Sequence, residues 1–263
     1  YWHPSGRYIA YSTNATSQVF HGSDRNRVEV FDTASDLQVY DVEKNTLLLS
    51  PHLRNDSIYE TYPAFSVDGR SLYFCAARAR PENSSKLDSI RYNLCRIDFD
   101  PSTGSFGNRI DTIVYAEGKN KSISFPRPSY DGRFLCYTLS DYGQFSIWHH
   151  EADLYLLNMS TGESKPMTGA NSDDTESFHN WSTNSRWLVF SSRRDDGLFT
   201  RPYFCHVDAK GVVSKAFMLP QRNPRRFYRE RFLSFNVPDF VIAPIQFNTH
   251  KACRIINDET RKR

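Results

Sequence analysis

Apolar residues along the chain occur in short runs separated by polar turns. In the clearest example a short apolar segment ends at Ser129, the pair Asp131-Gly132 follows, and the run 134–138 (Phe-Leu-Cys-Tyr-Thr) comes next. Asp-Gly is typical of a tight hairpin turn, whose backbone needs positive φ angles. The run after it is rich in aromatic and β-forming residues and is too short for a helix. The pattern therefore predicts a β-hairpin.

The same pattern occurs three more times, at residues 2–12, 65–75 and 181–191. In every copy an arginine follows the turn, a branched aliphatic residue stands two positions later, and an aromatic residue two positions after that. Gly6, Gly69 and Gly132 are each 63 residues apart, and Ser185 takes the equivalent place 53 residues beyond Gly132. We interpret this spacing as an internal structural repeat.

Each hairpin is followed by two further strand-like runs. The third runs lie at 36–41, 93–98, 153–158 and 203–208, and the fourth at 46–49, 109–115, 163–167 and 214–219. Four antiparallel strands per repeat are typical of a β-propeller blade. We therefore expect an all-β propeller over residues 1–220, with blades at about 1–50, 51–116, 117–168 and 169–220. Because the chain begins inside an innermost strand, we expect it to be a fragment, and the four blades to belong to a six-bladed or incomplete ring.

The pattern changes after Pro220, so residues 221–263 are expected to form a C-terminal extension. Asn223-Pro224 is a helix-start signal and predicts a short helix over 223–232. Residues 235–242 are expected to be an extended segment that packs on the last blade. The polar, basic end at 251–263 predicts a surface helix or a frayed tail.

Composition excludes several classes of protein. The chain has 263 residues and a net charge of +3, which is too small to indicate nucleic-acid binding. No stretch approaches the ~20 apolar residues of a membrane-spanning helix, and no amino-terminal signal peptide is present. Four of the five cysteines fall in predicted strands and Cys253 in the tail, with no spaced pair. We expect reduced core cysteines rather than metal or catalytic ones.

Recognition is expected on the face where the long connections emerge. These connections are residues 13–35, 76–92, 140–152 and 192–201, and long loops on a rigid scaffold are the usual seat of binding. The candidate ligand-binding residues are Tyr142, Trp148, His149, His150, His179, Arg193, Arg194 and Asp195.

These residues allow more than one interpretation. His149, His150 and His179, with His21, could assemble a metal site, but adjacent histidines on extended chain point in opposite directions and no zinc spacing is present, so no metal is expected. The run 193–197 is either a charged turn, whose ions pair with each other or with a neighbouring blade, or an anion site. The aromatic loop residues form either a contact surface for a peptide or sugar, or packing between blades; they are Tyr142, Phe145, Trp148 and Phe199.

The repeat resembles that of TolB-like β-propellers. The resemblance is carried by the Pro-x-x-Ser-x-Asp-Gly-Arg turn, the aliphatic–aromatic strand after it, and Ser-Arg-Arg-Asp, and it covers residues 1–220. The closest local match, residues 180–197, resembles TolB-like proteins of Bacteroidetes-type bacteria. The resemblance implies a six-bladed ring, a periplasmic or cell-envelope setting, and protein contacts.

Three functions remain open at this point. The first is a non-catalytic propeller that binds a protein or peptide in the bacterial envelope, and it is our prediction, with no catalytic residues, no metal and no cofactor. The second is the propeller domain of an enzyme similar to prolyl oligopeptidases, although no Gly-x-Ser-x-Gly motif occurs in this chain. The third is a carbohydrate-active propeller similar to oligogalacturonate lyases, which needs a metal and a convergent cluster that includes His149, His150, His179 and Arg194.

Overall fold

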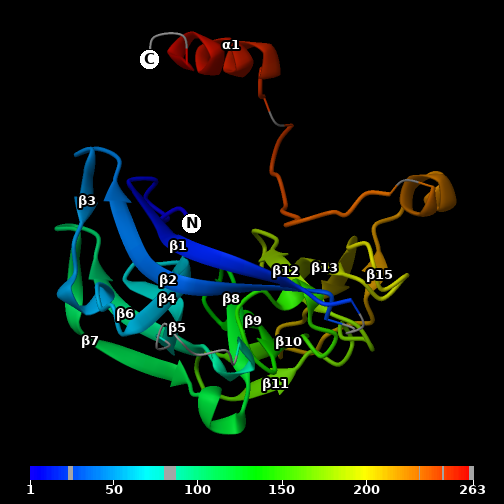
Figure 1. Cartoon of the computed structure of the whole chain (residues 1–263), viewed down its shortest axis with the longest axis horizontal. Helices are drawn as coiled ribbons and strands as arrows, with labels where there is room; N and C mark the ends of the chain where they lie inside the picture. Colours follow the sequence, from blue (N-terminus) through cyan, green and yellow to red (C-terminus); the bar gives the residue numbers. More distant parts are fainter. Residues whose placement is uncertain (23–25, 80–86, 231, 245, 261–263) are drawn as a thin grey trace.

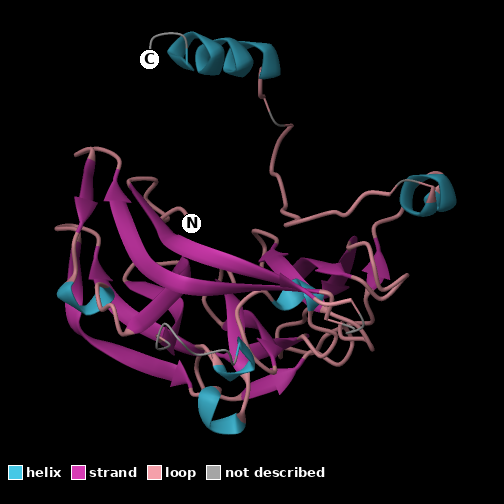
Figure 2. Ribbon diagram, in the orientation of Figure 1, coloured by secondary structure: helices cyan, strands magenta, loops and turns pink. Residues whose placement is uncertain are grey.

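The protein is a β-propeller of four antiparallel blades followed by a C-terminal extension (Figures 1 and 2). A computed structural model describes residues 1–22, 26–79, 87–230, 232–244 and 246–260. The all-β prediction is confirmed. Each blade is one sheet in which consecutive strands pair with each other. In the part of the chain that the structure describes, no helix is both long enough and apolar enough to cross a lipid bilayer.

The strands follow one another from the inner to the outer edge of each blade. The first blade contains β1 (Tyr8–Phe20), β2 (Val28–Asp41) and β3 (Thr46–Leu48), and an isolated bridge joins Trp2 to Ile9. The second contains β4 (Ile58–Phe65), β5 (Ser71–Arg78), β6 (Asn93–Asp100) and β7 (Ser105–Val114). The third contains β8 (Ser122–Pro128), β9 (Phe134–Ser140), β10 (Asp153–Asn158) and β11 (Ser164–Pro166). The fourth contains β12 (Glu176–Trp181), β13 (Trp187–Ser192), β14 (Arg201–His206) and β15 (Phe217–Met218).

The helical elements are short and lie in the connections within and between blades or in the C-terminal extension. Four are 3₁₀ turns: η1 (Pro51–Leu53), η2 (Leu87–Ser89), η3 (Glu117–Lys119) and η4 (Ser146–Trp148). In the extension, the helix predicted over 223–232 is a single π-helical turn, η5 (Arg225–Arg229), and the Asn223 side chain accepts from the Arg226 amide at 3.1 Å. The predicted terminal helix is α1 (Thr249–Thr260), which stands apart from the blades in Figure 1.

The repeated turn holds its shape through a shared set of hydrogen bonds. In the second blade the Ser66 hydroxyl donates to Asp68 Oδ1 at 2.6 Å, and the same oxygen accepts from the Arg70 amide at 3.0 Å. The third and fourth blades repeat these contacts around Asp131 and Asn184. We expected Asp-Gly to supply two positive φ angles, but only the second position has one, because each loop is a longer turn that ends on a left-handed residue.

Replacing Gly69 with alanine is expected to lower the free energy of unfolding by about 2 kcal/mol. Gly69 has a φ of +69°, and a Cβ there would lie 2.0 Å from Nε2 of the buried His3 ring, which holds the Gly69 carbonyl at 3.0 Å. Gly132→Ala is the matched control, because Gly132 has a φ of +71° and open space around it. Urea denaturation should show a loss of only about 1 kcal/mol for the control. Equal losses for both variants would contradict a steric role for His3.

Aromatic residues fill the space where three inner strands meet. Strands β4, β8 and β12 each carry a β-bulge, and at each bulge an aromatic residue has positive φ: Tyr62 (53°), Phe125 (53°) and Phe178 (51°). The ring centroids lie 4.0 Å apart between Tyr62 and Phe125 and 4.8 Å apart between Phe125 and Phe178. A left-handed backbone costs a bulky residue about 1–3 kcal/mol. Packing of these rings offsets that cost, so the bulges place one aromatic side chain from each of the second, third and fourth blades at the centre.

Hydrophobic clusters join neighbouring blades. One cluster lies between the first and second blades, one between the second and third, and one between the third and fourth. In the described residues no such cluster joins the fourth blade to the first. Cys75, Cys95, Cys136 and Cys205 are buried in strands with free thiols, as the sequence predicts. Burial raises the pKa of the Cys95 thiol to about 11 and that of Cys205 to about 12, which favours the protonated thiol over the reactive thiolate.

The first long connection is not a loop. We expected residues 13–35 to be a polar connection, but β1 and β2 continue into it and pair from Tyr8 with Asp41 to Phe20 with Val28, with one bulge at Ala15/Thr16. Residues 23–25 of this connection lie outside the described part of the chain. The prediction was wrong because this half of β1 is exposed and lacks the alternation of apolar residues that marks a buried strand. The second connection, 76–92, is partly strand β5, and its residues 80–86 lie outside the described part of the chain.

The extended hairpin crosses from the first blade to the third. Figure 1 shows β1 and β2 running along the molecule toward the fourth blade. The Tyr92 hydroxyl of the second blade donates to Asp32 Oδ2 at 2.9 Å. Near the hairpin tip, Asn26 Oδ1 accepts from the His150 amide at 3.2 Å, and the Tyr142 hydroxyl donates to Glu29. The hairpin therefore covers part of the face where the long connections emerge.

Candidate functional site

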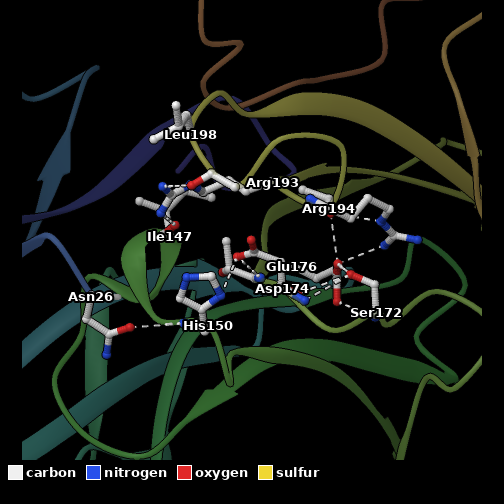
Figure 3. Close-up of polar contacts among 12 residues, drawn as sticks. Asn26, Ile147, His150, Ser172, Asp174, Glu176, Arg193, Arg194 and Leu198 are labelled. Carbon is white, nitrogen blue, oxygen red and sulfur yellow. Dashed lines mark hydrogen bonds and ion pairs between the residues drawn. The ribbon is translucent and has the colours of Figure 1, made fainter. Parts of the chain in front are cut away.

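Most of the sequence-predicted site residues gather where the connections of the third and fourth blades meet. Figure 3 shows His150, Asp174, Glu176, Arg193 and Arg194 in one polar cluster. η4 and the loop after it position His150, the connection before β12 positions Asp174, and the end of β13 positions the two arginines. The structure thus brings together residues that lie in separate loops of the sequence.

Glu176 is the most buried charge of the cluster. Its carboxylate accepts from the Arg194 guanidinium at 2.8 Å, the Ser192 hydroxyl at 2.8 Å and the Ser172 hydroxyl at 2.6 Å. Burial raises the pKa of Glu176 to about 6, and the charge of Arg194 opposes this rise. The hydrogen bonds that this carboxylate accepts in the described residues all come from neighbours within the fourth blade.

Arg193 is held by carbonyl oxygens and an aromatic ring. Its guanidinium lies 3.7 Å from the centre of the Trp148 ring, and it donates to the Gly197 carbonyl and, at 3.4 Å, to the Ile147 carbonyl. Burial lowers the pKa of Arg193 to about 10. Arg193 and Trp148 therefore fasten the third blade to the fourth by a cation–π contact.

The predicted histidines do not converge. His149 Nδ1 bonds Glu151 Oε1 at 3.1 Å, and His150 Nδ1 lies 3.2 Å from Asp174 Oδ1 without hydrogen-bond geometry. His179 lies inside the molecule on β12, where its Nε2 contacts the Cys136 carbonyl at 3.1 Å. Burial, with a smaller effect from Arg127, lowers the pKa of His179 to about 3. In the described ranges, no three His, Cys, Asp or Glu side chains come together as a metal site would require.

Asp195 stands at the edge of the cluster. Its carboxylate lies 3.5 Å from the guanidinium of Arg229 in η5. Asp196 pairs with the Arg201 guanidinium at 3.3 Å, and Arg194 pairs with Glu176, so three of the four charges at residues 193–196 have partners outside the run. These pairs favour the charged-turn interpretation. That a ligand binds the face where the long connections emerge remains a prediction.

A second candidate site lies at the opposite ends of the inner strands, beside the tight turns. It is a pocket of about 440 Å³ whose walls include Tyr1, Trp2, Phe65, Arg127, Trp181 and Asp239. Trp2, Phe65 and Trp181 stand at the same position of three repeats, directly before the turn, and Pro128 takes that position in the third blade. We call this cavity the axial pocket, because the inner edges of all four blades contribute to it.

Arg127 is the cation of the axial pocket. It donates from Nε to Asn180 Oδ1 at 3.2 Å and from Nη1 to the Pro126 carbonyl at 3.0 Å, and it lies 5.3 Å from the centre of the Tyr1 ring. Burial lowers its pKa, and the more distant charge of Asp239 opposes this. No carboxylate in the described residues lies within 4.0 Å of the guanidinium, which sets Arg127 apart from Arg194, whose guanidinium pairs with Glu176 at the opposite face.

Sequence reasoning did not identify the axial pocket. The signal was present, because the position two residues before each turn serine differs between blades: Ala64, Arg127 and Asn180. A charged residue at one copy of an otherwise uncharged repeat position indicates a local role. Recognising it requires knowing that these positions, far apart in sequence, converge at the ends of the inner strands.

Comparison with protein-family models and with curated protein sequences gives no match. Among solved structures, the chain is similar to TolB from Acinetobacter baumannii, with 20% identity and a TM-score of 0.45 over 80% of this chain and 41% of that one. It is similar to a puromycin-hydrolysing peptidase from Mycobacterium tuberculosis, with 14% identity and a TM-score of 0.49 over 82% of this chain and 30% of that one. It is also similar to an oligogalacturonate lyase in complex with manganese, with 10% identity and a TM-score of 0.47 over 84% and 64% of the two chains.

These similarities concern the fold alone. TolB is among the proteins that the chain resembles, as the repeat motif predicts, while the propeller architecture itself rests on the four sheets. The chain spans less than half the length of the TolB and peptidase structures and just under two thirds of the lyase. Activities and partners of those whole proteins are therefore carried over only as proposals.

Proposed function

We propose that this chain is a non-catalytic propeller that binds a protein or peptide partner at the axial pocket. One observation carries the proposal: the Arg127 guanidinium, in a pocket lined by all four blades, has no carboxylate partner within 4.0 Å among the described residues. A buried guanidinium forms its strongest hydrogen bonds with carboxylates. A partner that inserts an acidic side chain or a terminal carboxylate would supply the missing charge.

The shape and walls of the pocket fit a peptide. A volume of about 440 Å³ lies within the usual range for ligand sites. Aromatic side chains such as Trp2, Phe65 and Trp181 supply apolar contact area, and Asn180 adds polar groups that fix orientation. The bacterial cell envelope is the setting that we propose with this function, and the resemblance to TolB-like repeats supports it.

The chemistry of the remaining residues supports binding rather than catalysis. The oligogalacturonate-lyase-like alternative needs convergent histidines, whereas His149, His150 and His179 face different partners. The peptidase-like alternative places its catalytic residues in a separate domain, and it is compatible with a propeller that admits or holds peptides. Binding of a peptide is thus the element that two of the three alternatives share.

Replacing Arg127 with glutamine tests the proposal. Peptides selected from a random display library against the immobilised wild-type protein are expected to be enriched in acidic residues or to depend on a free C-terminus. Their affinity for Arg127→Gln should fall about tenfold or more, because a charge-assisted hydrogen bond is removed. Arg109→Gln, whose side chain is 82% exposed on β7, is the matched control and should bind as the wild type does. Selected peptides that bind both variants equally would overturn the assignment of the pocket.

A further inference from the structure

The C-terminal extension lies across the open face of the fourth blade as an extended segment, residues 233–240. It crosses the sheet from β14 to β12 and is not a strand of it. Phe235, Pro238 and Phe240 are half-buried, while Val237 is 51% exposed. The Phe240 ring lies 5.9 Å from the Phe204 ring, and the Phe235 ring stacks on Phe227 at 5.7 Å.

Side chains of the fourth blade hold this segment by its backbone carbonyls. Arg201 donates to the Leu233 carbonyl at 2.6 Å, and Asn180 donates to the Pro238 carbonyl at 2.7 Å. Between them, the Thr200 hydroxyl donates to the Phe235 carbonyl, and the Ser191 hydroxyl donates to the Asn236 carbonyl. The Thr200 carbonyl also accepts from the Phe235 amide at 3.1 Å.

These donors form a built site for an extended peptide. Ser191, Thr200 and Arg201 are 0%, 6% and 1% exposed, so their polar groups need internal acceptors. The acceptors are main-chain carbonyls, which every peptide carries, and only the aromatic contacts at positions 235 and 240 depend on sequence. A foreign peptide of the same chemistry would satisfy the same donors.

We infer that the open face of the fourth blade is a second binding site, which takes an extended partner segment carrying two aromatic residues five positions apart. Residues 233–240 occupy it in cis and compete with the partner. Val237 and Asp239 of this segment also line the axial pocket, so its exchange for a partner would remove part of that pocket wall. The inference rests on the side chains that donate to the carbonyls of the segment, and not on Arg127. In the described residues no hydrogen bond joins the segment to Arg127.

Binding of a labelled synthetic peptide in trans tests the inference. The probe is the nonapeptide of residues 233–241 with asparagine in place of Asp239, which removes attraction to Arg127, and the readout is fluorescence anisotropy with the full chain. Wild type should bind weakly because its own segment fills the site. Phe235→Asp with Phe240→Asp should release that segment and raise affinity about tenfold or more. Phe247→Asp, at a residue 68% exposed beyond the segment, should bind as the wild type does.

A second set of variants separates specific binding from misfolding. In the released background, Ser191→Ala with Thr200→Val should abolish peptide binding while circular dichroism and the melting curve remain those of a folded propeller. Arg127→Gln should leave binding of this peptide unchanged. A failure of the second binding site can therefore be distinguished from a failure of the proposal that the axial pocket binds a partner. The inference is overturned if hydrogen exchange shows the segment released yet affinity does not rise. It is also overturned if the donor substitutions leave binding intact, or if the released variant forms a dimer that excludes the peptide.

Discussion

Glu60→Gln is expected to raise the free energy of unfolding by about 3 kcal/mol at pH 8 and to leave it nearly unchanged at pH 4. Glu60 lies in β4 at the boundary of the first two blades and is 1% exposed. Its Oε2 atom has no hydrogen-bond partner in the described structure. Burial, with a smaller contribution from the charge of Asp36, raises the pKa of this carboxyl to about 8.

The direction of the pH effect follows from this raised pKa. Between pH 4.5 and 8 the folded state keeps a proton that the unfolded state has released, so wild-type stability falls as pH rises through that window. Glutamine has the shape of the protonated acid and does not titrate, so its stability should not fall there. Urea denaturation at several pH values measures the difference. Glu163→Gln, 60% exposed, is the control and should change stability by less than about 0.5 kcal/mol. If the free energy of unfolding changed with pH in the same way for wild type and Glu60→Gln, the raised pKa of the buried Glu60 carboxyl would be contradicted.

Arg194→Met is expected to lower the free energy of unfolding by about 3 kcal/mol at pH 8 and by clearly less at pH 5. Methionine keeps apolar contacts but leaves the Glu176 carboxylate buried without its cation. The contact of the Arg194 guanidinium with the Tyr203 ring, 4.4 Å from its centre, is lost at every pH. Only the charge penalty depends on pH.

Protonation of Glu176 explains that dependence. In the wild type its pKa is already raised to about 6, so the stability that it contributes is greatest below 4.5 and declines as pH rises through 6. Removing Arg194 raises this pKa further, which extends the decline to higher pH. The double variant Arg194→Met with Glu176→Gln should recover most of the loss at pH 8 in thermal or urea denaturation. Arg109→Met is the exposed control. An equal loss at pH 5 and pH 8 would show that packing, not charge, dominates at Arg194.

Local chemistry explains why the blades were predictable from sequence. The Ser-x-Asp-Gly turn forms its hydrogen bonds within five residues. The same short motif therefore forms the same turn in different blades. The third strand at 153–158 matches β10 at both ends. The polar hairpin over 13–35 could not be found this way, because its strands are stabilised by contacts with other blades and not by their own apolar pattern.

The site was less predictable because its parts are distant in sequence. The loops of the third and fourth blades do meet, which explains why Arg193, Arg194 and His150 form one cluster. Polar side chains in such a cluster are free for a ligand only if other residues do not already occupy their hydrogen bonds. Here Ser172 and Ile147 occupy some of them, and no sequence motif identifies these two residues. The left-handed backbone at Phe125 was equally hidden, since only packing against rings from other blades makes that conformation stable.

The hairpin that crosses the propeller also affects how the molecule comes apart. In arrays of repeats each unit contacts only its neighbours, so terminal repeats usually unfold first and alone. Here the hairpin joins the first blade to the third through Glu29 of β2 and Asn26 just before that strand, and to the second through Asp32 of β2. Loss of the first blade would break contacts in both others, so these three blades should melt together. No hydrogen bond among the described residues joins the hairpin to the fourth blade. We therefore expect the fourth blade to be the unit that can open independently.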